Sequence, residues 1–292
     1  MNCRYLVRGL FLISVFLTSS VASCLAEDSS YRKLLLEFIQ KKEGTRSLLQ
    51  KREKAVGAYS SLLVSMGCPE ELARQRACKF HDEVHFPDRM NWMESKYKQS
   101  VTEQDLKNGI TFFSSTAGSL AKEHLSVYHD EKVQAQMFNK ITPDIEKIVA
   151  GEKAGSVSVS LPKSYQKAYR EYYKLSSQEK SMGVLIGQIV SMISPDDEKL
   201  AASLAEYMNE NMMLLLMEAG YPTVTEADLK AFSDFFKTES GKKFSKTNAD
   251  ILQDVMNFST SETTKFQLSQ KNWMEEEAAK TDSAAASKAA KP

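Results

Sequence analysis

Apolar residues along most of this chain recur at intervals of three and four, which is the spacing of a helix with one buried face. In the first such stretch, Leu34, Leu35, Phe38 and Ile39 fall on the inward side. A β-type alternation occurs in SVSVS at 156–160, where it stands alone. The pattern predicts an all-α protein with helices over these ranges: 31–50, 53–66, 69–86, 88–99, 103–114, 119–141, 165–176, 179–193, 195–219, 226–237 and 242–278.

Prolines mark several of these predicted boundaries. Pro87 is expected to interrupt the helix that precedes it, and Thr142-Pro143 to open a short further helix. Ser194 followed by Pro195 has the pattern of a cap residue and a proline at the first helical position. The segment at 151–164 is rich in Gly and Ser and predicts a linker.

Two pairs of stretches repeat in the same order. VTEQDLKNGITFFSSTAG at 101–118 aligns without a gap with VTEADLKAFSDFFKTESG at 224–241, and 53–71 aligns with 179–197. Two collinear matches predict a tandem duplication of a unit of about five helices. The predicted organisation is an export signal at 1–26, a first helical repeat at 30–150, a linker at 151–164, a second repeat at 165–278 and a disordered tail at 279–292.

Each copy of the first pair begins like a helix N-terminus. Thr102 and Thr225 are expected to cap, with Asp105 and Asp228 three residues later in the capping-box position. Each copy then ends at a glycine that predicts a tight turn or a close helix approach. The motif residues of the two copies are Thr102, Asp105, Phe113 and Gly118, and Thr225, Asp228, Phe236 and Gly241.

The Thr-Glu-x-Asp-Leu-Lys start, the Phe-Phe pair and the small-residue turn resemble the bacterial secreted helical family catalogued as domain of unknown function 2059. Lys242-Lys243 follows the glycine in the second copy, whereas Ser119-Leu120 stands there in the first, which departs from the family's pattern. The resemblance covers about twenty residues per copy. It implies an all-α domain in an exported bacterial protein, and it adds no activity because the family has none established.

Residues 1–26 predict an export signal rather than structure. Arg4 and Arg8 precede an apolar run, Leu10 to Leu17, that is too short to cross a bilayer. An ordinary signal peptidase would cut after Ala22 or Ala26.

A second cleavage site competes with these. Val21-Ala22-Ser23-Cys24 resembles a lipobox, which implies cleavage before Cys24 and lipidation of its thiol. Both alternatives predict a periplasmic protein, either soluble or anchored to a membrane as a lipoprotein.

The charge balance narrows the class of partner. The chain has 38 Lys and Arg against 38 Asp and Glu, and loss of the signal removes only two arginines. Near neutrality argues against bulk electrostatic binding of nucleic acid.

The tail from 279 offers no large apolar residue to a core and is expected to be disordered.

The segment CKFHDEVH at 78–85 holds the strongest candidate metal ligands. On an α-helix Cys78, His81 and His85 would share a face, because they stand at i, i+3 and i+7. Imidazole and thiolate ligands suit zinc or copper. The second copy has no counterpart of these residues.

Cys68 and Cys78 could instead form a disulfide, which would remove Cys78 as a metal ligand, because an exported protein meets oxidising conditions. Ten residues of continuous helix span about 15 Å, whereas bonded cysteines have Cα atoms within about 7 Å. The disulfide and the predicted helix are therefore incompatible, and the sequence favours the helix.

Two further clusters are expected to pack in a core. Met208, Met212, Met213 and Met217 include thioethers of the kind that bind copper, but the intervening leucines make this helix apolar nearly all round. The tyrosines of YREYY at 169–173 have the spacing of a packing stripe.

The sequence contains no G-x-S-x-G, Walker A, H-E-x-x-H or G-x-G-x-x-G motif. We therefore expect a non-enzymatic binding role in the cell envelope, without a cofactor, for an unidentified envelope protein or small ligand. Grooves between the two repeats are the expected contact surface. The alternative is a periplasmic metal-binding protein that uses Cys78, His81 and His85.

Overall fold

The computed structural model describes residues 29–127 and 130–289. Within these ranges the regular elements are helices and no β-strand occurs, which confirms the all-α class. The helices are α2 (Ser30–Glu43), α3 (Thr45–Ser65), α4 (Glu70–Phe80), the π-helix η1 (His81–His85), α5 (Phe86–Tyr97), α6 (Glu103–Ser114), α7 (Thr116–Val127), α8 (Glu131–Val149), α9 (Lys163–Leu175), α10 (Gln178–Ile193), α11 (Glu198–Gly220), α12 (Glu226–Lys237) and α13 (Glu239–Ala289).

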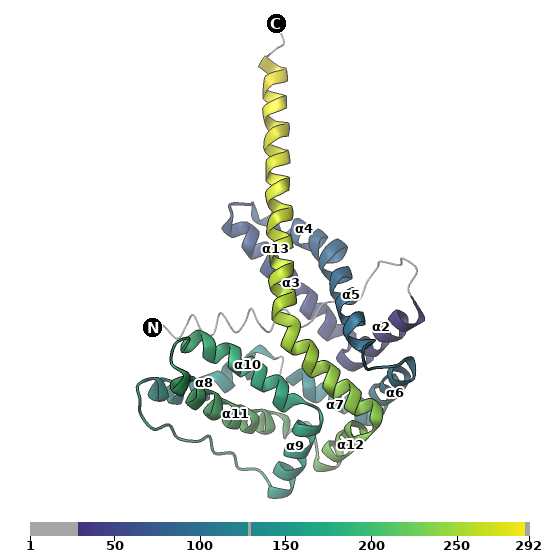
Figure 1. Cartoon of the computed structure of the whole chain (residues 1–292), viewed down its shortest axis with the longest axis vertical. Coiled ribbons are helices and arrows are strands. Elements are labelled where there is room, and N and C mark those ends of the chain that lie inside the picture. Colours follow the sequence, from purple (N-terminus) through teal and green to yellow (C-terminus); the bar gives the residue numbers. More distant parts are fainter. Residues whose placement is uncertain (1–28, 128–129, 290–292) are drawn as a thin grey trace.

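Three hydrophobic clusters hold these helices together. The large core contains residues from every helix between α7 and α12. An amino-terminal core contains residues of α2, α5 and α6, and a third core lies between α3 and α4. Figure 1 shows α8, α10 and α11 on one side of the molecule, with α13 running past α12 and then past α3 and α4. Helix α13 contributes Phe244 to the amino-terminal core and Phe266 to the third core.

The cores do not follow the predicted repeat boundary. Helices α7 and α8 lie in the first half of the sequence, yet Ala121, Met137 and Ile141 pack in the large core with the second half. Helix α13 lies in the second half and packs against α10 and α12 there, but it also packs against α5 and α6 of the first half. The last helices of each half therefore pack against helices of both halves.

The predicted helix starts at Thr102 and Thr225 are confirmed. Thr102 accepts a hydrogen bond from the Asp105 amide at 3.2 Å, and the Asp105 carboxylate accepts one from the Thr102 amide at 2.9 Å. Thr225 and Asp228 make the same pair of bonds at the same distances. Both α6 and α12 begin and end where the periodicity predicted.

Both repeat glycines lie at a one-residue corner between two helices. Ser115 joins α6 to α7 and Thr238 joins α12 to α13, and each side chain accepts a hydrogen bond from the following glycine amide at 3.1 Å. A Cβ on Gly118 would lie 2.0 Å from the Phe112 carbonyl oxygen, and one on Gly241 would lie 2.1 Å from the Phe235 oxygen. The predicted close approach is therefore confirmed in both copies.

The Phe-Phe pairs of the two copies meet each other. The rings of Phe112 and Phe235, which occupy equivalent positions in the alignment, stack with centroids 3.9 Å apart and planes 3° apart. Each ring also makes an edge contact with the phenylalanine that follows it. Equivalent residues thus form the contact between α6 and α12.

The expected single helix over 31–50 is wrong. Gly44 ends α2 with a φ of 80°, which is a conformation that glycine adopts without a steric penalty. The chain turns there, and α3 starts at Thr45 and continues to Ser65.

The expected interruption at Pro87 is also wrong. The chain passes from α4 through η1 into α5, and the Phe86 amide donates to the carbonyl of His81, five residues back. A proline inside an α-helix lacks a donor and clashes with the carbonyl four residues earlier. The wider π-turn just before Pro87 accommodates both effects.

Three other boundaries differ from the predictions. The stretch over 119–141 is two helices, because α7 ends at Val127 and Asp130 caps α8. Pro143 lies inside α8 rather than at the start of a helix. Asp197 caps α11, whereas Ser194 ends α10, because Asp197 accepts the hydrogen bond from the Leu200 amide at 2.9 Å.

The predicted disordered tail is helical as far as the structure describes it. Helix α13 continues to Ala289, and its alanine-rich end favours a helix. Figure 1 shows this end projecting beyond the other helices.

The linker is an extended segment that packs on the protein. Val157, Val159 and Leu161 contact the large core, and the Val157 amide donates to Asn211 at 2.6 Å. The β-type alternation of SVSVS thus marks an extended segment with one buried side.

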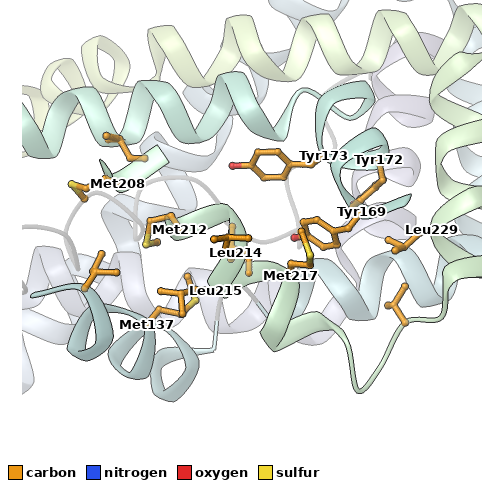
Figure 2. Packing of buried hydrophobic residues seen from close by; sticks show 14 of the residues in the cluster. Met137, Tyr169, Tyr172, Tyr173, Met208, Met212, Leu214, Leu215, Met217 and Leu229 are labelled. Carbon is orange, nitrogen blue, oxygen red and sulfur yellow. The ribbon is translucent and has the colours of Figure 1, made fainter. Parts of the chain in front are cut away.

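The packing roles expected for the methionines and tyrosines are confirmed (Figure 2). Met208, Met212 and Met217 are buried in the large core, and Met213 is partly buried against it. The three tyrosines of 169–173 are buried in the same core.

Cys68 and Cys78 are free thiols, and Cys78 lies inside α4, which begins two residues after Cys68, so the structure agrees with the helix rather than the disulfide. The predicted export signal, including Cys24, lies outside the described residues. Among the helices of the described ranges, none combines the length and the apolar content that a membrane span needs.

Candidate functional site

A partly enclosed cavity of about 280 Å³ lies where the two halves of the chain meet. Its walls come from the first half through α2, α3, α5, α6 and α7, and from the second half through α9, α10, α12 and α13. Phe113 and Phe236, which occupy equivalent positions in the two aligned stretches, both line it. The cavity therefore depends on the way the halves interlock.

The charge of the cavity wall is unbalanced. Four lining side chains are cationic, and Glu43 is the one carboxylate among the described lining residues. Lys51 donates to Glu43 at 3.0 Å, and Lys42 donates to the Asn248 amide oxygen at 3.2 Å. The four cationic residues are Lys42, Lys51, Arg89 and Lys122.

Burial shifts the pKa of each of these groups in the direction that favours its uncharged form. It lowers the pKa of Lys42 and of Lys51, and Glu43 offsets only part of this effect. Burial also lowers the pKa of Arg89 to about 10. Burial raises the pKa of Glu43, but Lys51 and Lys42 outweigh it and hold that pKa below its usual range.

The rest of the wall is largely apolar and aromatic. Tyr97, Phe113, Tyr172 and Phe236 line it together with aliphatic side chains from α2, α5 and α13. The Gln178 side chain adds a polar point, because its amide nitrogen donates to the Tyr172 hydroxyl at 2.8 Å and its amide oxygen is buried without a partner among the described residues. A small molecule with an apolar body and a few polar groups matches such a wall.

The sequence analysis did not single out the cationic residues of this site. A lysine in a chain that is 26% charged carries little signal. One signal was present, because Lys51 follows Leu48 by three residues and precedes Ala55 by four, within a buried helical face. Lys42 likewise follows Phe38 and Ile39 at helical spacing. Lys42 and Lys51 could therefore have been identified from the sequence as charged residues on a predicted apolar helix face.

The two histidines predicted as metal ligands are brought together. Their rings lie 5.4 Å apart, and both side chains are buried in or beside η1. His81 Nδ1 lies 2.8 Å from an Asp82 carboxylate oxygen, while its Nε2 is buried without a hydrogen-bond partner in the described part of the chain. His85 Nδ1 lies 3.2 Å from the Tyr59 hydroxyl.

Glu262 of α13 joins this cluster, which the sequence did not suggest. Its carboxylate is fully buried, 3.3 Å from His85 Nδ1 and 2.9 Å from Lys265 Nζ. Cys78 is partly buried one turn earlier, before the π-turn changes the helical spacing. Across residues 29–127 and 130–289, no group of three or more His, Cys, Asp or Glu side chains is arranged to hold a metal ion. The zinc or copper site at Cys78, His81 and His85 stays a prediction, supported only by the proximity of the histidines.

The buried His124 is expected to make the stability of the protein depend on pH. It packs against Tyr169 and Tyr172, and burial lowers its pKa to about 4. Between about pH 6.5 and 4 the unfolded state then binds a proton that the folded state does not, so this contribution is complete above about pH 6.5 and declines as the pH falls. We expect His124 alone to lower the free energy of unfolding by about 2 kcal/mol at pH 5 relative to neutral pH.

Urea denaturation of the full chain at pH 7 and pH 5 measures this decline. His124→Leu should make the difference between the two pH values smaller by that amount. An unchanged difference would contradict the assignment to His124.

Comparisons with known family models, with curated proteins and with solved structures find no match for this chain. The resemblance to the secreted helical family therefore stays a prediction.

Proposed function

We propose that this chain is an exported, non-enzymatic binding protein of the bacterial cell envelope, and that the cavity between its halves is the ligand site. The observation that carries the proposal is a cavity of about 280 Å³ with a largely apolar wall and a few polar groups. Natural small-molecule sites have this composition and lie at junctions between structural units. The expectation of a contact surface between repeats supports the same location.

We further propose that the architecture arose by tandem duplication. The matching capping boxes of α6 and α12 support this origin, as do the matching corners at Gly118 and Gly241. The stack of Phe112 on Phe235 would then be the contact of one unit with its copy. A duplicated helical unit leaves a seam between copies, and the cavity lies at that seam.

Location and family membership belong to the same proposal. Export through residues 1–26 would place the protein in the periplasm, soluble or anchored through Cys24. Membership of the secreted helical family rests on the repeated motif alone.

Filling the cavity tests the proposed site. Ser181 of α10 lines the cavity, whereas Ser191 is exposed on the same helix. We expect one or more of three probes with the same phenylpropyl body to bind the wild-type chain saturably: 3-phenylpropanoate, 3-phenylpropan-1-ol and 3-phenylpropylamine. Ser181→Phe should weaken that binding by at least tenfold because it occupies the space, and Ser191→Phe should leave it unchanged.

Isothermal titration of the full chain measures the binding. If none of the three probes binds, or if both variants bind as the wild type does, the cavity is not the ligand site.

A further inference from the structure

We infer that the ligand of this cavity is a small organic anion with an apolar body. The inference rests on the proposed function and adds the chemical class of the ligand. Its first support is the charge of the wall, in which four cationic side chains face one carboxylate among the described lining residues. The chain as a whole carries no net charge, so this local excess is a property of the site.

The anionic group of the ligand would pair with the cationic part of the cavity wall. Lys51 is 9% exposed and Arg89 is 6% exposed, so both charges are largely removed from water. Glu43 pairs with Lys51 at 3.0 Å, and it is the one carboxylate among described lining residues that also include Lys42 and Lys122. A buried charge is stabilised by a nearby opposite charge, and a carboxylate or phosphate on the ligand supplies one.

Lys122 of the cavity wall brings a further cation from a different helix. It belongs to α7, and its stem lies beside Gly44, where a Cβ would be 3.4 Å from Lys122 Cδ. The described residues offer its ammonium no carboxylate within ion-pair distance, and the side chain is only partly buried. Lys122 is therefore a cation that a ligand can pair with at little cost to the fold.

The apolar wall excludes a bare inorganic ion as the best occupant. Aromatic side chains, among them Tyr97, Phe113 and Tyr172, line the remainder of the cavity. Burial of the apolar body of a ligand against them contributes roughly 25 cal/mol per Å². The volume of about 280 Å³ corresponds to about nine water molecules at roughly 30 Å³ each. An anion of about ten non-hydrogen atoms, such as an arylalkyl or medium-chain carboxylate, is of the matching size.

The same probes test this inference separately from the proposed function. We expect 3-phenylpropanoate to bind the full-length mature chain at least tenfold more tightly than 3-phenylpropan-1-ol, and 3-phenylpropylamine to bind most weakly of the three. Lys122→Met should weaken binding of the carboxylate by about tenfold and leave binding of the alcohol unchanged. Lys41→Met is the matched control, because Lys41 is exposed beside Lys42 and lies outside the cavity wall.

Isothermal titration at low and moderate salt gives each affinity. Equal or tighter binding of the alcohol or the amine would overturn the inference and leave the proposed site standing. Displacement of 3-phenylpropanoate by inorganic phosphate at equal concentration would also overturn it, because the apolar body would then contribute nothing. Loss of preference in the Lys41→Met control would assign the effect to general charge and contradict the site.

Discussion

Gly118→Ala and Gly241→Ala are each expected to destabilise the protein by about 3 kcal/mol or more. The added Cβ would lie 2.0 Å from the Phe112 carbonyl oxygen in the first copy and 2.1 Å from the Phe235 oxygen in the second. Both obstacles are backbone atoms of the preceding helix, so no side-chain rotation relieves the clash. Either the corner opens or the helices separate, and both changes disturb the Phe112–Phe235 stack.

Gly57→Ala and Gly183→Ala are the matched controls. These glycines lie within α3 and α10, and a Cβ on either would meet nothing within 4 Å. We expect each control to be stabilising by about 0.5–1 kcal/mol, because alanine has the higher helix propensity. Chemical denaturation measures all four variants. Similar effects at the corner and control positions would contradict the role of the corner.

Asp105→Asn is expected to lower the free energy of unfolding by about 3 kcal/mol at neutral pH. Asp105 is 6% exposed, and its carboxylate accepts hydrogen bonds from Ser240 and Lys243 of α13, each at 2.7 Å. It also accepts from the amide and the hydroxyl of Thr102. The substitution removes the charge that pairs with Lys243 and replaces an acceptor oxygen with a donor.

Asp228→Asn controls for the cap itself. Asp228 makes the same bonds to Thr225, but the positions equivalent to Ser240 and Lys243 hold Ala117 and Leu120 in the first copy. We expect this variant to be destabilising by no more than about 1 kcal/mol. Equal losses at Asp105 and Asp228 would show that the bonds to α13 contribute nothing.

The contribution of Asp105 to the free energy of unfolding is also predicted to depend on pH. Burial raises the pKa of Asp105, but hydrogen bonds from Lys243, Thr102 and Ser240 outweigh it and hold the pKa well below its usual range. This stabilisation is therefore complete above about pH 4, the usual value for Asp, and declines as the pH falls further. The decline starts below the range in which His124 acts, so denaturation against pH separates the two groups.

Features set by neighbouring residues could be predicted from the sequence. The capping boxes at Thr102 and Thr225 depend on residues three positions apart, and both formed as expected. The bounds of α6 and α12 followed from the same local pattern. The core packing of the methionines followed from the apolar surroundings of Met212 and Met217 in the chain.

Features that depend on tertiary packing were not predicted. The residues next to Pro87 predict the end of a helix there. The π-turn at His81–His85 instead lets the chain continue from α4 into α5 without a break. The packing of α7 and α13 against helices of both halves has no signal in the sequence, because it depends on which surface each helix meets. The cationic cavity depends on that packing, since Lys122 of α7 and Asn248 of α13 both line it.

The most direct test of the ligand site is a methyl NMR titration of the full chain, labelled at methionine and isoleucine, with 3-phenylpropanoate. The account predicts saturable shifts at Met93 and Ile251, which line the cavity, and unchanged signals from Met208 and Met217 in the large core. Signals at Met93 and Ile251 that do not move, or shifts centred on Met208 and Met217, would contradict a ligand site between the two halves.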